Sequence, residues 1–511
     1  MAEKITLEEA LRENKELKAK IAELTEMVNY LQKQLFGKKT EKLSVGQLDL
    51  FDDKEQETAP TNDSTVEKLT TTVTSHQRKC KSKESRKEWL DCLEQVEELH
   101  QLSKQELTCD QCGQMMTVIG KHEQYREVKL VPAHLCCKIV CTETARCEHC
   151  QDSETGNDVL VQAKTPQPLF PHSYLSSSVI AEVLFEKFGL AVPFTRQTQY
   201  WERLGLPITS KHMARGVIEA GERFGQKIYE RLRQEIKAAP VVQLDETPFQ
   251  VLDLDQSHGY FWSACSTEEF SPHQVSYFHY APSRSGKVIT EILGDDFSGG
   301  IMCDGFSGYS DNRLPEAYWG TCLVHINRQF KRLLDPKITR FQGQSIASDA
   351  VRILTKVFHI EKRLKYSSAS EKAAQRRQHL KAMIDDFYQL IEEALTKSPL
   401  KPLRNAIKNA LKLKKRVYQM FRHGELPLHN NHNEQLIRPT TLVRKNSLFA
   451  KSTAGAKANA IWYSIVQTAK LNHLDVFKYL ETLLSAFTKR ETPEIEAYLP
   501  WAREIQESCK A

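Results

Sequence analysis

Long apolar runs are missing from this chain of 511 residues. No uninterrupted apolar stretch approaches the roughly 18 residues that a membrane-spanning helix requires. The opening residues Met1–Lys4 also lack the pattern of a secretory signal peptide. These two absences argue against a membrane protein and an exported one, so we expect no membrane partner and a cytoplasmic location.

Charge is close to balanced overall but unevenly distributed along the chain. Hydrophobic residues make up 40% and charged residues 27%, as in soluble globular proteins, and the length predicts three or more domains. The net charge is +5, yet residues 326–420 hold 22 Lys/Arg and 8 Asp/Glu, a net of +14 that leaves −9 elsewhere. This concentration predicts a polyanionic partner for residues 326–420, with a solvated helical face as the alternative.

Residues 5–36 carry a heptad repeat. Its two core positions are occupied, seven residues apart, by Leu7, Asn14, Ile21, Val28 and Leu35 and by Ala10, Leu17, Leu24 and Leu31. Branched residues at the first position, leucines at the second and one core Asn favour a parallel two-stranded coiled coil. We therefore expect a homodimer through this segment, with a helix packed on its own chain as the alternative. The polar, acidic residues 45–75 predict a disordered linker, and a short basic arm follows it.

Two cysteine pairs have the spacing of zinc knuckles. Cys109 and Cys112 form the first pair, and Cys147 and Cys150 form the second pair after a long spacer. Four thiolates hold Zn²⁺ tetrahedrally and leave no open position, so we predict a structural Zn²⁺ rather than a catalytic or redox site. The alternation over Val128–Cys141 predicts a hairpin between the two pairs. The absence of an export signal places the thirteen cysteines in a reducing compartment.

Residues 170–238 have a helical pattern. A break at Gly205–Ser210 separates a helix ending near Leu204 from a long helix that runs to Ala238 and is capped by Thr209 or Ser210. This order is compatible with a helix-turn-helix that binds DNA. A corner in an ordinary helical bundle is the alternative.

Three carboxylates stand at the ends of predicted elements. The apolar run in Val241–Pro248 predicts a buried strand that ends at Asp245, before a Thr-Pro break, and a shorter strand flanked by glycines ends at Asp304. Glu434 lies in the polar segment His429–Pro439, which opens a short helix. Mg²⁺ takes oxygen ligands, and two such ions about 4 Å apart stabilise the attacking and leaving oxygens of a phosphoryl transfer. The three acids therefore predict a site for two hard cations.

The order of elements from residue 240 onward is strand, strand, strand, helix, strand, helix, strand. This is the order of a ribonuclease-H-like fold, in which the first and fourth strands are neighbours, so Asp245 and Asp304 should lie side by side although they are far apart in the sequence. We predict a multidomain α/β protein with a ribonuclease-H-like catalytic core that carries a helical insertion at residues 326–428. Its expected parts are a coiled coil (1–44), a linker with the basic arm (45–100), a zinc-binding module (101–165), a helical DNA-binding region (166–238), the catalytic domain (239–453) and a C-terminal helical region (454–511).

A series of short motifs extends over nearly the whole chain, namely Phe36–Leu43, the two cysteine pairs, Leu244–Thr247, Cys303–Tyr309, Cys322–His325, Asn431–Pro439, Arg444–Asn446, Thr468–Asn472 and Leu499–Trp501, with Pro193, Arg196 and Gln197 as a shorter match. With these motifs the chain resembles the insertion sequence 66 family of DDE-type transposases. Each motif alone is weak, but their order and spacing are specific. At position 435 this chain has Gln where the family commonly has Arg.

The resemblance implies that Asp245, Asp304 and Glu434 are the catalytic triad of a DNA transposase. It also implies Mg²⁺ or Mn²⁺ at the active site, binding to the terminal inverted repeats of a mobile element and to target DNA, small accessory proteins from the same element, and a bacterial, nucleoid-associated location. In this interpretation Asp245 bridges both ions, Asp304 holds one and Glu434 the other.

Basic residues near these motifs are candidate DNA contacts. Arg438 lies four residues after Glu434 and should share its helical face, Arg444 and Lys445 follow in a predicted loop, and Arg196 belongs to the shorter match. His325, at the end of the predicted fifth strand, would orient a phosphate or serve as a structural histidine. Two other functions stay open at this point. One is a catalytically silent, dimeric zinc protein that binds DNA, and the other is a nuclease that cleaves RNA.

Overall fold

The computed structural model describes residue Gln114 and residues 133–151, 158–254, 258–334, 345–397, 399–489 and 493–511. The chain divides into one unit of Met1–Gly37 and Ala133–Ala511 and a second unit of Lys38–Pro132. Apart from Gln114, the described residues belong to the first unit. The predicted coiled coil, the linker with its basic arm, and Cys109 and Cys112 lie outside the described residues.

Two short strands precede the main body of the first unit. β1 (Thr144–Gln151) pairs antiparallel with β2 (Asp158–Gln162), and their register shifts between Arg146 and Gln151. The hairpin predicted over Val128–Cys141 is wrong for its described part, because residues 133–141 contain no strand and are exposed. Alternation alone does not form a hairpin when neither face of the segment has a surface to cover.

The helical region begins with α3 (Ser177–Leu184) and its π-helical extension η2 (Phe185–Gly189), followed by α4 (Phe194–Arg203). Thr209 caps α5 (Ser210–Ala220) by accepting a hydrogen bond from the backbone N–H of His212, as predicted. The long helix to Ala238 is present but is interrupted by a π turn, η3 (Gly221–Gly225), before α6 (Gln226–Ala238).

Five strands form the central sheet in the order β5-β4-β3-β6-β7. They are β3 (Val241–Phe249), β4 (Gly259–Ser266), β5 (Ser276–Ala281), β6 (Gly300–Cys303) and β7 (Tyr318–Thr321). The first three are antiparallel, whereas β6 and β7 run parallel to β3. The predicted pairing of the first and fourth strands is confirmed, with Val241 opposite Gly300 and Gln243 opposite Met302.

Strand β3 does not end at Asp245, as the sequence had predicted, but continues to Phe249. Its pairing with β6 stops at Gln243, while its pairing with β4 continues until Phe249 lies opposite Gly259. Beyond Gln243 the strand has a partner on one side only, which is the situation in which a strand tolerates proline. Pro248 therefore does not break it.

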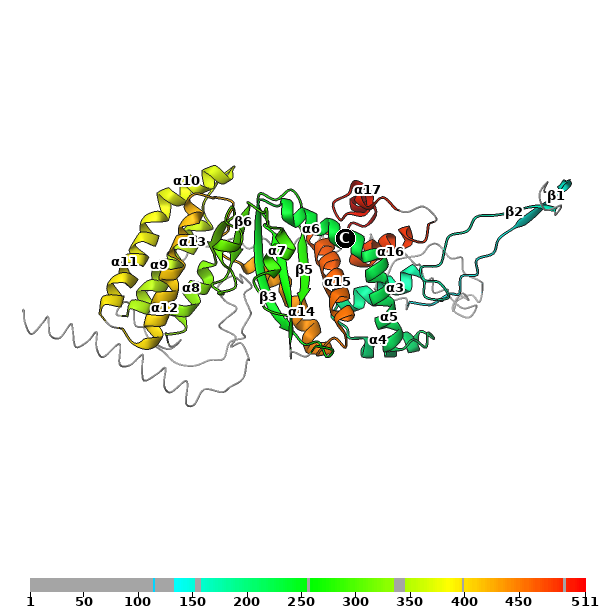
Figure 1. Ribbon diagram of the computed structural model, residues 1–511, viewed down its shortest axis with the longest axis horizontal. Coiled ribbons are helices and arrows are strands. Elements are labelled where there is room, and N and C mark those ends of the chain that lie inside the picture. Colours follow the sequence, from blue (N-terminus) through cyan, green and yellow to red (C-terminus); the bar gives the residue numbers. More distant parts are fainter. Residues whose placement is uncertain are drawn as a thin grey trace, which may run out of the picture. The chain divides into compact units, whose positions relative to one another are not determined.

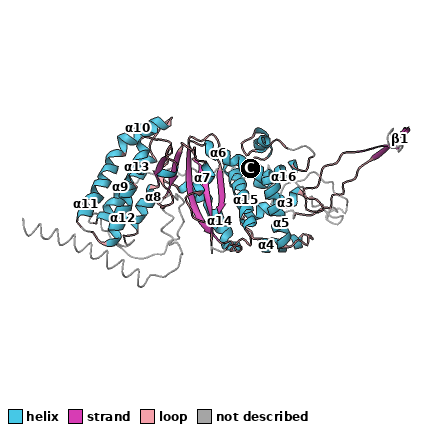
Figure 2. Cartoon of the chain, in the orientation of Figure 1, coloured by secondary structure: helices cyan, strands magenta, loops and turns pink. Residues whose placement is uncertain are grey.

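Helices cover both edges of this sheet. On α15 (Thr453–Leu471), the hydroxyl of Thr468 accepts the backbone N–H of Ser276 at 3.1 Å, and that of Ser464 accepts the N–H of Phe278 at 2.8 Å, so edge strand β5 has side-chain partners. At the other edge, β7 contacts α13 (Lys414–Tyr418). Figure 2 shows the strands with helices on either side.

The remaining connections are short. α7 (Val288–Leu293) joins β5 to β6, and the single turn η4 (Asp311–Arg313) joins β6 to β7. After α15 the chain forms α16 (Val476–Ala486), η7 (Ile495–Tyr498) and α17 (Arg503–Ser508). None of the helices in the described part of the chain is apolar over a length that would cross a membrane.

The predicted insertion is helical and has a hydrophobic core of its own. It contains α8 (Leu323–Lys331), α9 (Ile346–Glu361), α10 (Ala369–His379), α11 (Lys381–Thr396), α12 (Lys401–Lys412), α13 and the turn η6 (Gln419–Phe421), drawn in green to orange in Figure 1. The first helix starts at Leu323, three residues before the predicted boundary. The chain then returns to the sheet as α14 (Asn431–Ser447), which contacts β3 and β4.

Candidate active site

Asp245 lies on β3 two residues beyond the last pair that β3 forms with β6. On its other side β3 continues to pair with β4, where Ser263 is opposite Asp245. The carboxylate accepts a hydrogen bond from the backbone N–H of Glu246 at 2.9 Å. Asp245 therefore stands where two parallel strands separate at their carboxyl ends, the place where open α/β sheets bind ligands.

Asp304 follows the last residue of β6. The register between β3 and β6 is constant along their pairing, and continuing it by two residues places Asp304 opposite Asp245. The Asp304 carboxylate accepts the backbone N–H of Phe306 at 2.8 Å, a side-chain turn that fixes the chain as it leaves the strand. Two carboxylates from neighbouring strands thus lie at the same level of the sheet.

Glu434 lies in the first turn of α14, and two buried asparagines fix that turn to the sheet. Asn433 donates to the carbonyls of Gln243 (3.1 Å) and Ser263 (3.2 Å), and it accepts from the Ser263 hydroxyl at 2.6 Å. Asn430 donates to the carbonyl of Leu244 at 2.8 Å. Because these carbonyls flank Asp245 in sequence and in space, the amides place the first turn of α14 directly over it.

A histidine and an arginine of α8 approach Glu434. The Nε2 atom of His325 lies 3.7 Å from one carboxylate oxygen of Glu434, and a guanidinium nitrogen of Arg328 lies 3.9 Å from the other. His325 was predicted at the end of the fifth strand, but β7 ends at Thr321 and His325 belongs to the first turn of α8. The sequence prediction missed that a helix begins at Leu323, directly after Cys322.

Asp245 is buried beside other acids. Burial, followed by the charges of Glu246, Glu434 and Asp304, raises the pKa of Asp245 to about 8, against the opposing hydrogen bond from the Glu246 backbone. Acids crowded together in this way favour a bound cation, which stabilises their charged forms. The electrostatics thus couple Asp245 to both of the other predicted acids.

Glu246 has a separate set of partners. Its carboxylate forms an ion pair with Arg284 and accepts a hydrogen bond from the Tyr309 hydroxyl. Burial raises the pKa of Glu246, while Tyr309 and Arg284 oppose that shift. Because the Glu246 carboxylate is already paired with Arg284 and Tyr309, it is not a free ligand for a cation at Asp245.

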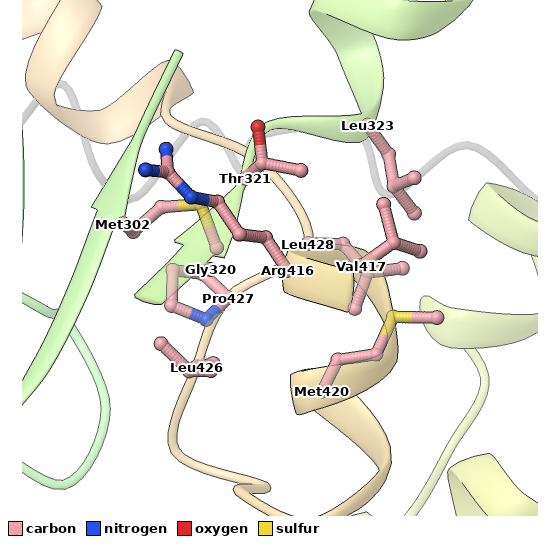
Figure 3. Close-up of a pocket in the computed structure, with 10 residues that line it drawn as sticks. All are labelled: Met302, Gly320, Thr321, Leu323, Arg416, Val417, Met420, Leu426, Pro427 and Leu428. Atoms are coloured by element: carbon pink, nitrogen blue, oxygen red, sulfur yellow. The ribbon is translucent and has the colours of Figure 1, made fainter. Parts of the chain in front are cut away.

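A small cavity of about 10 Å³ lies between the sheet and the insertion. Figure 3 shows its lining, which includes Met302 of β6, Gly320 of β7, Arg416 of α13 and Leu426 of the returning segment. A volume of this size holds about one water molecule. None of the three acids lines this cavity, which is a packing gap between the insertion and the back of β6 and β7 rather than a substrate pocket.

The family of the chain follows from its match to a model described as "Transposase IS66 family" over residues 172–458. This match covers more than half of the chain and includes Asp245, Asp304 and Glu434. The chain belongs to the IS66 transposase family. A second model, described as "Transposase C of IS166 homeodomain", matches residues 23–97 of this IS66-family protein.

Relatives that match most of this IS66-family chain occur in Sinorhizobium fredii. The uncharacterized protein y4qI is 24% identical over 94% of this chain and 89% of its own length, and y4hP is 24% identical over 93% and 87%. A third, y4jD, is 25% identical over 77% of each chain. The similarity therefore extends beyond residues 172–458 to most of the sequence.

The predicted DNA contacts of this IS66-family protein have different surroundings. Arg196, Arg438 and Lys445 are exposed. Arg444 donates to the hydroxyl of Thr247 at 3.3 Å and to the carbonyl of Pro248 at 2.6 Å, so it holds α14 against the end of β3. The loop predicted for Arg444 and Lys445 is wrong, because α14 continues through Pro439 to Ser447.

Sequence reasoning also missed the polar residues that join α14 to the sheet. Asn430, Asn433 and Gln243 are all buried, and the Gln243 side chain donates to the carbonyl of His429 at 3.0 Å. The available signal was Gln243 itself, a polar residue inside an otherwise apolar strand, because a buried amide requires partners. Of the predicted zinc ligands, Cys147 and Cys150 lie on β1.

Proposed function

We propose that this chain is a DNA transposase whose acids Asp245, Asp304 and Glu434 bind two divalent ions, Mg²⁺ or Mn²⁺. The observation that carries the proposal is the electrostatic coupling of Asp245 to both Glu434 and Asp304, three acids brought together from two strands and a helix. The residues fit such ions, since one oxygen of Glu434 is buried and has no hydrogen-bond partner among the described residues. Family membership supports the same chemistry.

The sheet supports a ribonuclease-H-like interpretation of the core. Its strand order, with three antiparallel strands followed by two strands parallel to the first, places the first and fourth strands together. In that arrangement Asp245 lies on β3 just past the pairing of β3 with β6, and Asp304 directly follows β6. The chain returns from the insertion as α14, which carries Glu434. The expected boundaries of this domain, 239–453, remain part of the proposal.

In the proposed reaction the protein positions DNA and holds charge, and no covalent protein intermediate is required. Bound Mg²⁺ would supply Lewis-acid stabilisation of the leaving oxygen and lower the pKa of the attacking water. Asp245, Asp304 and Glu434 would hold the ions, and this role of Asp245 is supported by its electrostatic coupling to both of the other acids. His325 and Arg328, both beside Glu434, are positioned to contact a phosphate oxygen as DNA enters.

The other modules would deliver DNA to this site. We propose a structural Zn²⁺ at Cys109, Cys112, Cys147 and Cys150, a dimer through residues 5–36, and DNA contact by the helices on either side of Gly205. The exposed Arg196, Arg438 and Lys445 are candidate phosphate contacts. Accessory proteins of the same element complete the proposal.

A cleavage and strand-transfer assay tests the central claim. The substrate is a duplex that carries one end of the element encoding the chain, supplied with Mg²⁺ or Mn²⁺. Wild type should nick and join this DNA, whereas Asp304→Asn should bind it with unchanged affinity and leave it intact. The matched control is Asp296→Asn, an acid whose side chain is 86% exposed, which should cleave normally. Binding without cleavage by wild type in either metal would instead identify a catalytically silent DNA-binding protein.

A further inference from the structure

A second group of metal-binding side chains adjoins the three acids. Cys322 precedes the first residue of α8, His325 lies in its first turn, and Glu434 lies in the first turn of α14. One ligand atom from each residue lies within 4.8 Å of the other two. Only Glu434 belongs to the proposed catalytic set, so the structure brings a thiol and an imidazole to one of its acids.

The chemistry of this group differs from that of the acid site. Mg²⁺ binds oxygen ligands and has little use for a thiolate, whereas sulfur, nitrogen and one carboxylate oxygen are the ligands of Zn²⁺. Softer thiolate ligands select zinc over magnesium. The cluster therefore has the composition of a zinc site rather than an extension of the magnesium site.

The geometry also favours an ion at this position. The Nε2 atom of His325 and the nearer oxygen of Glu434 are 3.7 Å apart, close to the roughly 3.3 Å expected between two ligands of tetrahedral Zn²⁺ with bonds of about 2.0 Å. That same oxygen is buried without a hydrogen-bond partner among the described residues. Cys322 is fully buried, and its sulfur accepts the backbone N–H of Asn430 at 3.3 Å, which orients it.

We propose that Cys322, His325 and Glu434 form a second metal site, selective for thiophilic divalent ions and for Zn²⁺ in particular. A zinc ion bound there uses the Cys322 thiolate, whose proton passes to solvent, and takes an oxygen of Glu434. Glu434 is then withdrawn from the site it shares with Asp245 and Asp304, so zinc inhibits cleavage. The inhibition rests on the proposed function, whereas the binding does not.

Equilibrium dialysis of the full-length protein against Zn²⁺ tests the binding. Wild type should hold one more equivalent of Zn²⁺ than either Cys322→Ser or His325→Asn, because the other predicted zinc ligands are unchanged in both variants. Cys509→Ser is the matched control, since Cys509 is a buried thiol that contacts Thr482 instead, and it should equal wild type. Circular dichroism establishes that each variant is folded, and the partly exposed His325 provides the milder substitution. If wild type and a folded His325→Asn variant bind the same number of Zn²⁺ equivalents, the proposed zinc site is wrong.

Cleavage in Mg²⁺ at increasing Zn²⁺ tests the shared ligand. Each protein is compared with its own zinc-free rate, so a slower variant remains informative. The zinc concentration for half-inhibition should rise at least about tenfold in Cys322→Ser, the scale on which changes around a zinc site weaken it. Excess Mg²⁺ should relieve inhibition of wild type. If zinc binds through Cys322 but does not inhibit cleavage, the proposal that both metal sites share Glu434 is wrong. If no protein cleaves in Mg²⁺, the transposase proposal fails, and dialysis alone decides the zinc site.

Discussion

Replacing Asp245 by Asn should stabilise the protein while removing its proposed activity. The folded structure raises the pKa of Asp245 from 3.8 to about 8. Between these values the folded protein retains a proton that the unfolded chain releases. Stability therefore falls as pH rises from about 4 to about 8. The penalty is fully developed above pH 8 and absent below about pH 4.

The magnitude follows from the size of that shift. At pH 7, which is below the folded pKa and about 3 units above the unfolded pKa of 3.8, the penalty at about 1.4 kcal/mol per unit has an upper bound of about 4 kcal/mol. Solvent that reaches the partly exposed carboxylate reduces this to about 2–3 kcal/mol. Asn keeps the shape of the side chain and an oxygen that accepts the Glu246 N–H, but it carries no charge. The substitution should therefore recover most of the penalty.

Urea unfolding from pH 4 to pH 9 in buffer free of Mg²⁺ measures the effect. Asp245→Asn should match wild type near pH 4, exceed it by about 2–3 kcal/mol at pH 7, and exceed it by more at pH 8. Added Mg²⁺ should then stabilise wild type and not the variant. The control, Asp296→Asn, removes an exposed acid and should leave the pH profile unchanged. A variant that is no more stable than wild type at pH 8 would refute the proposed crowding of acids.

Three further substitutions test Asn433 beside the site and buried charges elsewhere in the fold. Asn433→Ala removes three hydrogen bonds to β3 and β4 and should lower unfolding stability by about 2–4 kcal/mol in urea, with weaker Mg²⁺ binding by calorimetry. Arg376→Met leaves Glu361 unpaired and should cost about 3–5 kcal/mol, and adding Glu361→Leu should restore part of the loss in a double-mutant cycle. Burial lowers the pKa of Lys187 to about 8, so Lys187→Met should stabilise the protein by about 1–3 kcal/mol at pH 7, and the gain should shrink toward pH 10 as the unfolded lysine also loses its charge.

The pairing of the two strands that lead to Asp245 and Asp304 could be predicted because it depends on signals that lie in the sequence. Two apolar strands each lead to an acid, and the order of elements between them requires the first and fourth strands to be neighbours. The structure confirms that strand pairing, with Val241 opposite Gly300. The roles of these acids in catalysis remain predictions.

Local rules failed where tertiary contacts decide the structure. A Thr-Pro step normally ends a strand, but β4 pairs with β3 through Pro248 and extends it. The run that leads to His325 fits a strand or a helix equally well over so few residues. The strand changes to helix at Cys322, where the backbone N–H of Leu323 donates to the carbonyl of Leu428 at 2.9 Å, far away in the sequence. That contact joins distant parts of the sequence, so the hydrophobic periodicity of the run itself could not predict it.

The same contact explains how a long insertion can precede the third acid without displacing it. The chain leaves the sheet at Leu323 and returns at Leu428, and the hydrogen bond between them brings the two ends of the insertion together. Within the insertion, Arg376 is fully buried and donates to the carbonyls of Met420, Gly424 and Leu426 while pairing with Glu361. These bonds fix the segment that leads from the insertion back to the sheet. Farther along the chain, Asn430 and Asn433 attach α14 to the sheet. The position of Glu434 is therefore set by the folded insertion as well as by the strands. A defect at Arg376 should consequently reach the acid site through the backbone that leads into α14.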